Sequence, residues 1–99
     1  MPERGPLVTR QTMLILSILM DNAEPVAGSA MAATSGLASG TLYPILIRLE
    51  EAGWIESDWQ EASGREAKPR RRLYRLTAYG AHKAREEAMA WKPLVERFA

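Results

Sequence analysis

The sequence contains no cysteine and only one histidine, His82. The absence of cysteine excludes disulfide frameworks, thiolate zinc sites and iron–sulfur clusters, and it fits a reducing compartment. His82 lies in a charged segment with no second histidine at ligand spacing, so a metal-sensing site is not expected either. We expect a protein without a metal or a cofactor.

Long hydrophobic runs are also missing. The longest, Met13–Met20, has eight residues, whereas a membrane-spanning helix needs about 20. No signal-peptide pattern is present, because Glu3 and Pro6 precede this run and no small-residue cleavage site follows it. With 46% apolar and 25% charged residues, the composition is that of one globular domain. We expect a cytoplasmic protein that does not bind membranes.

The patterns of catalytic sites are absent as well. The sequence has no nucleophile–base pair, no phosphate-binding glycine loop and no dinucleotide fingerprint. The acidic pairs Glu50-Glu51 and Glu86-Glu87 fit solvated helix surfaces better than catalytic carboxylates. We therefore do not expect an enzyme.

What the sequence does contain is a clear helical pattern at its centre. Apolar residues recur there with the i, i+3, i+4, i+7 spacing of a helix that buries one stripe: Leu42, Ile45, Leu46 and Leu49. Gly53 follows this stripe and is suited to a left-handed C-terminal cap. Pro44 favours Thr41 over Ser39 as the N-cap, because proline is tolerated only near a helix start.

The opposite face of this predicted helix is not that of a solvated helix. It carries Tyr43 and Ile47 together with a single positive charge, Arg48. Exposed helix faces normally hold glutamate, lysine, glutamine and arginine. Because local rules tend to be broken at functional sites, we interpret this segment as a recognition helix.

Two further helices are predicted before it. Thr9 can cap a helix that runs to about Asn22, and this helix is apolar on nearly every side, so a second chain could help to cover it. A second, alanine-rich helix is predicted over Val26–Ser35, followed by a short turn over 36–38. Its expected inward residues are Val26, Ala30, Ala33 and Thr34. Two short helices with a glycine-containing turn fit a helix-turn-helix, although any antiparallel helical hairpin would share the spacing.

A two-residue period after Gly53 predicts a β-hairpin. One face alternates through Ile55, Ser57 and Trp59, and a second strand alternates through Arg72, Tyr74 and Leu76, with a polar loop over 61–69 between them. Arg65–Arg75 contains six basic residues and one acidic residue, so this hairpin is strongly positive although the chain carries only +1. The sequence predicts an α+β, mostly α fold: a winged helix-turn-helix with three helices and a two-stranded wing.

The last predicted helix has an apolar seam of the kind found in helix pairs. The seam residues recur at steps of three and four: Ala84, Ala88, Trp91, Val95 and Phe98. On the helix that faces this seam, the candidates are Leu14 and Ile18. Pro93 should kink the seam. The seam can pack on a second copy of the chain or on its own first helix. We favour a homodimer and divide the chain into a flexible arm (1–8), a winged helix-turn-helix domain (9–77) and a dimerisation helix (78–99).

Two runs of residues resemble a known family. Ser39–Pro44 with Arg48-Leu49-Glu50 and Gly53 forms the first run, and Tyr74–Thr77 with Gly80 forms the second. Together they resemble the PadR-like transcriptional regulators (phenolic acid decarboxylase regulators), in particular their short branch. The resemblance implies a homodimer in which the C-terminal helix packs on the partner's N-terminal helix. It also implies a repressor that is relieved by a small, often aromatic, ligand.

A recognition helix contacts base edges in the major groove mainly through its N-terminal residues. The candidates here are Ser39, Gly40, Thr41, Leu42 and Tyr43. Arg48 is a candidate phosphate contact, or it pairs with Glu50 or Glu51. The wing residues expected on phosphates are Arg65, Lys68, Arg70 and Arg71. Arg72 and Arg75 are instead expected to pair with Glu56 or Asp58 across the hairpin.

Some alternatives remain open at this stage. Trp91 is either a packing anchor or an aromatic surface on which a flat effector stacks. A winged helix that binds a protein partner, or a MarR-like regulator, would also fit the predicted elements. The favoured interpretation is a repressor that binds a palindromic operator in double-stranded DNA.

Overall fold

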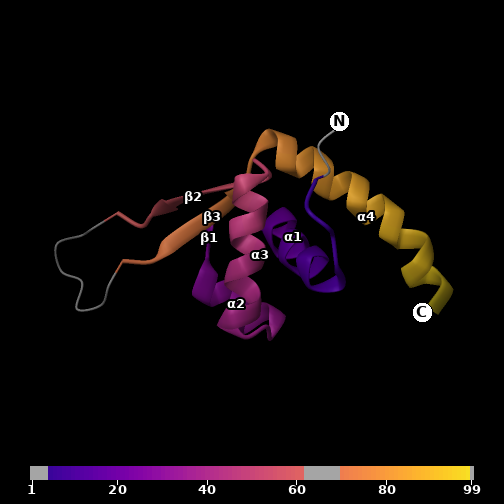
Figure 1. Cartoon of the computed structure of the whole chain (residues 1–99), viewed down its shortest axis with the longest axis horizontal. Helices are drawn as coiled ribbons and strands as arrows, with labels where there is room; N and C mark the ends of the chain where they lie inside the picture. The colour runs from indigo at the N-terminus through magenta and orange to yellow at the C-terminus, as the bar shows by residue number, and fades with distance from the viewer. Residues whose placement is uncertain (1–4, 62–69, 99) are drawn as a thin grey trace.

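A computed structural model describes residues 5–61 and 70–98, with side chains as far as Lys92. The structure has four helices and a small antiparallel sheet of strand order β1-β3-β2, and the hairpin of β2 and β3 projects away from the helices (Figure 1). In chain order the elements are α1 (Arg10–Asp21), β1 (Val26–Ala27), α2 (Gly28–Ser35), α3 (Ser39–Glu51), β2 (Ile55–Trp59), β3 (Arg72–Leu76) and α4 (Ala78–Phe98). The predicted order of three helices, a hairpin and a final helix is confirmed. Residues 1–4, Arg65 and Lys68 lie outside the described residues, as do the side chains of Val95 and Phe98.

The sheet has one strand more than predicted. Val26 and Ala27, expected to start a helix, pair instead with Tyr74 and Leu73 of β3. A two-residue strand leaves no periodicity in the sequence, and its partner strand comes more than forty residues later. The second helix therefore begins at Gly28 and ends at Ser35, and Gly36 follows as a left-handed cap with φ of 77°.

This later start also changes which side of α2 faces inward. Met31 is fully buried and makes the main contact of α2 with the core, whereas Ala30, Ala33 and Thr34 are exposed. The predicted inward set was therefore wrong at these three alanine and threonine positions. In an alanine-rich helix the single large apolar residue decides the inward face, because it buries the most surface.

α1 begins where it was predicted. The side chain of Thr9 accepts a hydrogen bond from the Thr12 backbone N–H at 3.2 Å, as an N-cap does. Ile15 and Leu16 are fully buried. The helix is apolar on nearly every side, as predicted, and Leu14 is 40% exposed. One strip of α1 is therefore not covered within a single chain.

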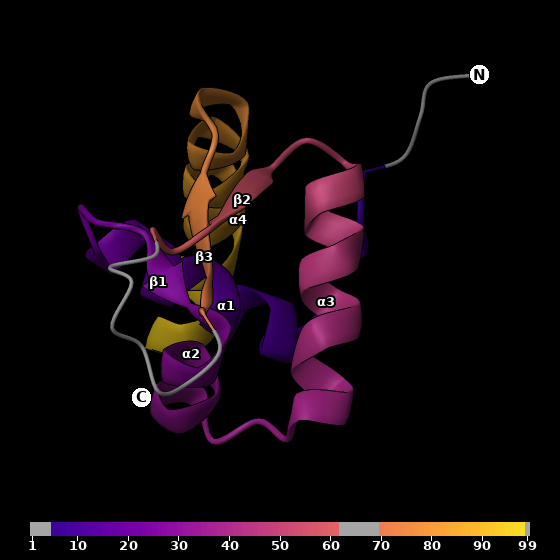
Figure 2. The ribbon, with the colours of Figure 1, turned by 90° about the vertical axis from the view of Figure 1, so that its left-hand side faces the viewer.

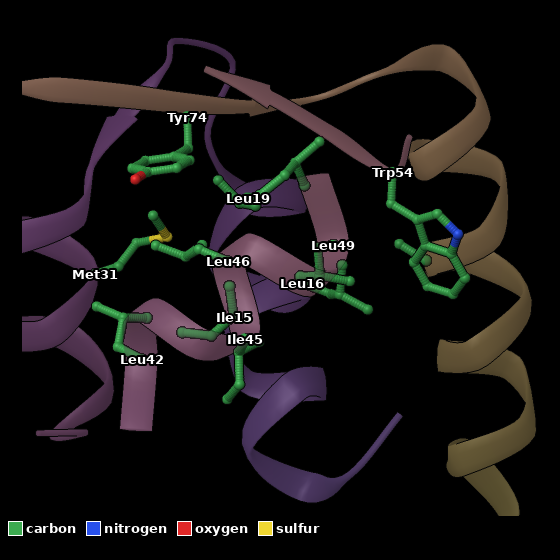
Figure 3. Packing of buried hydrophobic residues seen from close by; sticks show 12 residues of the cluster. Ile15, Leu16, Leu19, Met31, Leu42, Ile45, Leu46, Leu49, Trp54 and Tyr74 are labelled. Atoms are coloured by element: carbon green, nitrogen blue, oxygen red, sulfur yellow. The ribbon is translucent and has the colours of Figure 1, made fainter. Parts of the chain in front are cut away.

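The core lies between α1, α2, α3 and the sheet, and Figure 3 shows its labelled side chains converging there, with Trp54 at the α4 side. Ala84 of α4 also belongs to this core and is fully buried in its own chain. Its assignment to a dimer seam is therefore corrected: the small side chain allows the first half of α4 to pack closely on α1. Beyond that point α4 continues past the body of the molecule (Figure 1). No helix within the described ranges is long and apolar enough to cross a bilayer.

Candidate nucleic-acid interface

α3 is held in place by its buried stripe and by its C-terminal cap. Leu42 and Leu49 are fully buried, and Ile45 and Leu46 nearly so. The Gly53 N–H donates to the Glu50 carbonyl at 3.0 Å and the Trp54 N–H to the Leu49 carbonyl at 2.9 Å. With φ of 78° at Gly53, this is a Schellman cap, and the predicted left-handed glycine is confirmed. The outward face of α3 is thereby fixed in direction (Figure 2).

The N-terminus of α3 is open. The helix begins at Ser39, and its N-cap is Ala38, so the predicted N-cap Thr41 was wrong. The N–H groups of Thr41 and Leu42 both donate to the Ala38 carbonyl at 2.9 Å. The N–H groups of Ser39 and Gly40 come too early for an intrahelical acceptor, and both residues are exposed. This end of the helix can therefore donate to an outside acceptor.

One predicted base contact must be withdrawn. Leu42 has no exposed surface and its side chain lies in the core, between α2 and α3. It cannot reach a base edge without unfolding the helix from the core. The exposed candidates at this end are Ser39, Gly40, Thr41 and Tyr43.

Tyr43 is positioned by the start of α2. Its side chain is 40% exposed and packs on Gly28, where an added β-carbon would lie 2.7 Å from the tyrosine hydroxyl oxygen. A larger residue at position 28 would therefore displace the ring. Tyr43 lines a shallow groove of about 360 Å³ together with Ser29, Trp59 and Arg70. Its hydroxyl is thus placed at the junction of α2, α3 and the wing.

A polar network joins α3 to the wing. Ser57 donates its hydroxyl to Glu50 at 2.6 Å, and the Arg72 Nε–H donates to the Ser57 hydroxyl oxygen at 3.0 Å. The Arg72 guanidinium also lies 3.9 Å from Glu50 and 5.2 Å from the centre of the Trp59 ring. Glu50 at the end of α3 therefore contacts the hairpin directly. Sequence reasoning did not find this network.

The expected hairpin ion pairs are half correct. Arg75 pairs with Glu56, the residue directly opposite, at 2.6 Å. Arg72, in contrast, lies opposite Trp59 and on the same face as Ser57 and Tyr74, so it points toward α3 and does not meet Glu56 or Asp58. Arg72 therefore links the wing to α3, although its side chain is still partly exposed.

The remaining wing cations are available for a partner. Arg70 and Arg71 are exposed where the two strands separate, next to the backbone bond from the Gln60 N–H to the Arg71 carbonyl at 2.7 Å. Within residues 5–61 and 70–92, neither Arg70 nor Arg71 forms an ion pair, and the same holds for Arg48 on α3. Glu50, a predicted partner of Arg48, is engaged by Ser57 and Arg72 instead.

Tyr74 lies at the base of this surface and is nearly buried. Burial raises the pKa of its phenol, and the neighbouring Tyr43 and Glu50 raise it further, whereas Arg72 lowers it. Tyr74 is therefore uncharged at neutral pH and serves as a packed support between α3 and the wing.

These elements define a winged helix-turn-helix protein: α2 and α3 form the helix-turn-helix, and β2 and β3 form the wing, which starts near the end of α3 and projects away from it (Figures 1 and 2). The sequence model of the transcriptional regulator PadR-like family matches residues 15–86. The chain therefore belongs to the PadR-like family of transcriptional regulators, as the resemblance predicted. This assignment decides against a MarR-like regulator.

Solved structures agree with this assignment. A PadR-like transcription factor from Bacteroides fragilis is 28% identical, and the match covers 88% of this chain and 84% of that protein, with a TM-score of 0.70. A PadR-family regulator from Clostridium difficile is 25% identical over 89% of this chain and 93% of its own, with a TM-score of 0.74. A PadR-family regulator from Eggerthella lenta is 30% identical, and the match covers 90% of this chain and 80% of that protein, with a TM-score of 0.69. No curated protein matches the sequence.

Proposed function

We propose that this regulator binds double-stranded DNA sequence-specifically, with α3 in the major groove and the wing on the phosphate backbone. The observation that carries the proposal is the open start of α3, with Ser39, Gly40 and Thr41 exposed, on a domain whose wing exposes Arg70 and Arg71. A helix N-terminus and exposed arginines both favour an anionic partner. Arg48, about two turns further along α3 than Thr41, is placed to contact a phosphate.

Binding to duplexes from the flanks of the protein's own gene, measured by fluorescence anisotropy at moderate salt, tests this function. Regulators of this class often act on nearby promoters, so one flanking fragment should bind more tightly than a scrambled duplex of equal length. Equal affinity for all duplexes, or no binding to any, would contradict the proposal. Retention of a protein partner without DNA would instead support a winged helix that acts as a protein-interaction module.

The protein acts as a homodimer on a palindromic operator. α1 and α4 each keep an exposed apolar side chain: Leu14 is 40% exposed and Met89 is 68% exposed. Ile18, Ala88 and Trp91 are only half-buried within one chain. The second half of α4 extends past α1, and a second copy would cover it.

Light scattering at micromolar concentration tests the dimer. Leu14→Glu should shift the protein toward the monomer, because it places a charge in the proposed seam. Leu7→Glu is the matched control, since Leu7 is 82% exposed in the N-terminal segment. A wild-type protein of monomer mass would contradict the dimer.

The dimer represses transcription until a small aromatic effector binds at Trp91. Trp91 is half-buried at the end of the described side chains, and two copies of it would face the same seam. Quenching of tryptophan fluorescence by 4-hydroxybenzoate should be lost in Trp91→Phe and kept in Trp59→Phe, which removes the exposed wing tryptophan. Equal quenching in both variants would place the ligand elsewhere or exclude it.

A further inference from the structure

Along the middle of the outward face of α3, the residues as far as Ile47 have no side chain that can form a hydrogen bond. Directly opposite the buried stripe, the helical repeat aligns Gly40, Pro44, Ile47 and Glu51. All four are exposed, and Ile47 has 57% of its surface accessible. The part of α3 that faces a partner most directly is therefore apolar as far as Ile47.

This face cannot use the usual paired hydrogen bonds to purines. Arginine or lysine recognises guanine, and asparagine or glutamine recognises adenine, through two bonds from one side chain. α3 contains no lysine, asparagine or glutamine, and its one arginine, Arg48, lies to one side of the row from Gly40 to Glu51. The apolar group that B-DNA presents in the major groove is the 5-methyl group of thymine.

Ile47 presents an apolar group of restricted conformation beside the wing. It lines a groove of about 400 Å³ between α3 and the wing, together with Glu50, Arg72 and Tyr74. The network from Glu50 through Ser57 to Arg72 fixes the far wall of this groove. Isoleucine has few rotamers in a helix, and the ring of Pro44 one turn earlier is rigid. Both side chains therefore present a fixed apolar surface.

We propose that Ile47, supported by Pro44, determines specificity by contacting the 5-methyl group of a thymine in each half-site of the operator. This inference rests on the proposed DNA binding and names the chemical group that α3 recognises. The polar ends of the surface, Thr41 and Arg48, then orient the helix, and the apolar centre distinguishes thymine from the other bases.

The experiment compares thymine with uracil, which lacks only the methyl group. A duplex is first selected from a random pool with the wild-type protein, and each thymine of a half-site is then replaced singly by deoxyuridine. At one position or more, replacement should weaken binding about fourfold, the effect of losing one buried methyl group. The same series is measured with Ile47→Ala, Ile47→Val and the surface control Leu7→Ala.

The variants assign the contact to Ile47. Ile47→Ala should bind the thymine and uracil duplexes equally at that position, whereas Ile47→Val and Leu7→Ala should keep the preference for thymine. If the wild type tolerates uracil everywhere, or if Ile47→Ala keeps the full preference, the inference is wrong although the protein binds DNA. If no duplex is enriched from the pool, the proposed function itself fails.

Discussion

Gly80 of α4 packs against the backbone carbonyl of Trp54: a β-carbon at position 80 would lie 1.6 Å from that oxygen. Thr77 completes the contact. Its hydroxyl donates to the Gly53 carbonyl at 2.7 Å and accepts from the Gly80 N–H at 2.9 Å. The end of α3 and the start of α4 are therefore joined at one corner. The two sequence runs that indicated the family, one ending at Gly53 and one at Gly80, meet there in space.

Gly80→Ala should lower the free energy of unfolding by about 3 kcal/mol, because the added methyl group meets backbone that cannot move without displacing α4. The change in the free energy of unfolding is measured by urea titration, with circular dichroism as the signal. The matched control is Gly40→Ala, also in a helix, where a β-carbon would have nothing within 4 Å. That variant should be more stable by up to about 1 kcal/mol. Equal midpoints for Gly80→Ala and the wild type would contradict the packing described.

Arg70→Ala and Arg71→Ala should each weaken binding to all duplexes and reduce the slope of log K against log salt by about 1, because each removes one phosphate contact. Arg75→Ala is the matched control, on strand β3 directly after these two residues. Its guanidinium lies 2.6 Å from Glu56, so it should leave the slope unchanged. The salt dependence of anisotropy titrations decides the matter. A wing whose arginine variants all keep the wild-type slope does not contact the backbone.

Tyr74→Phe should remove a loss of stability at alkaline pH. Because burial raises the pKa of Tyr74, the unfolded chain loses this proton near pH 10, while the folded protein still holds it. Above pH 10 the unfolded state thus binds fewer protons than the folded state, and stability falls as pH rises; below pH 10 this contribution is constant. Urea midpoints at about pH 8 and pH 10.5 should therefore differ less in Tyr74→Phe than in the wild type. The same difference in both proteins would show that Tyr74 titrates normally.

The sequence was most informative where strong local signals coincide. Four large apolar residues at helical spacing and a glycine at the cap defined α3, because each depends only on neighbours within one helix. The ion pair between Arg75 and Glu56 could also be predicted, since the alternation of the strands places the two residues directly opposite each other.

What the sequence could not provide depends on distant parts of the chain. β1 exists only because Val26 and Ala27 meet β3. The network of Glu50, Ser57 and Arg72 depends on how the hairpin lies against α3. Leu42 is a different case: the helical spacing correctly placed it in the buried stripe, and the base contact suggested by its place near the helix start conflicted with that burial.

The most direct test of the account is the affinity of Gly40→Ala for a duplex selected by the wild-type protein. In the isolated protein a β-carbon at position 40 meets nothing, so the fold should be kept or stabilised. If the start of α3 lies close against the floor of the major groove, the added methyl group should weaken binding about tenfold or more, as overpacking does. Wild-type affinity in a folded Gly40→Ala protein would contradict the placement of α3 on DNA.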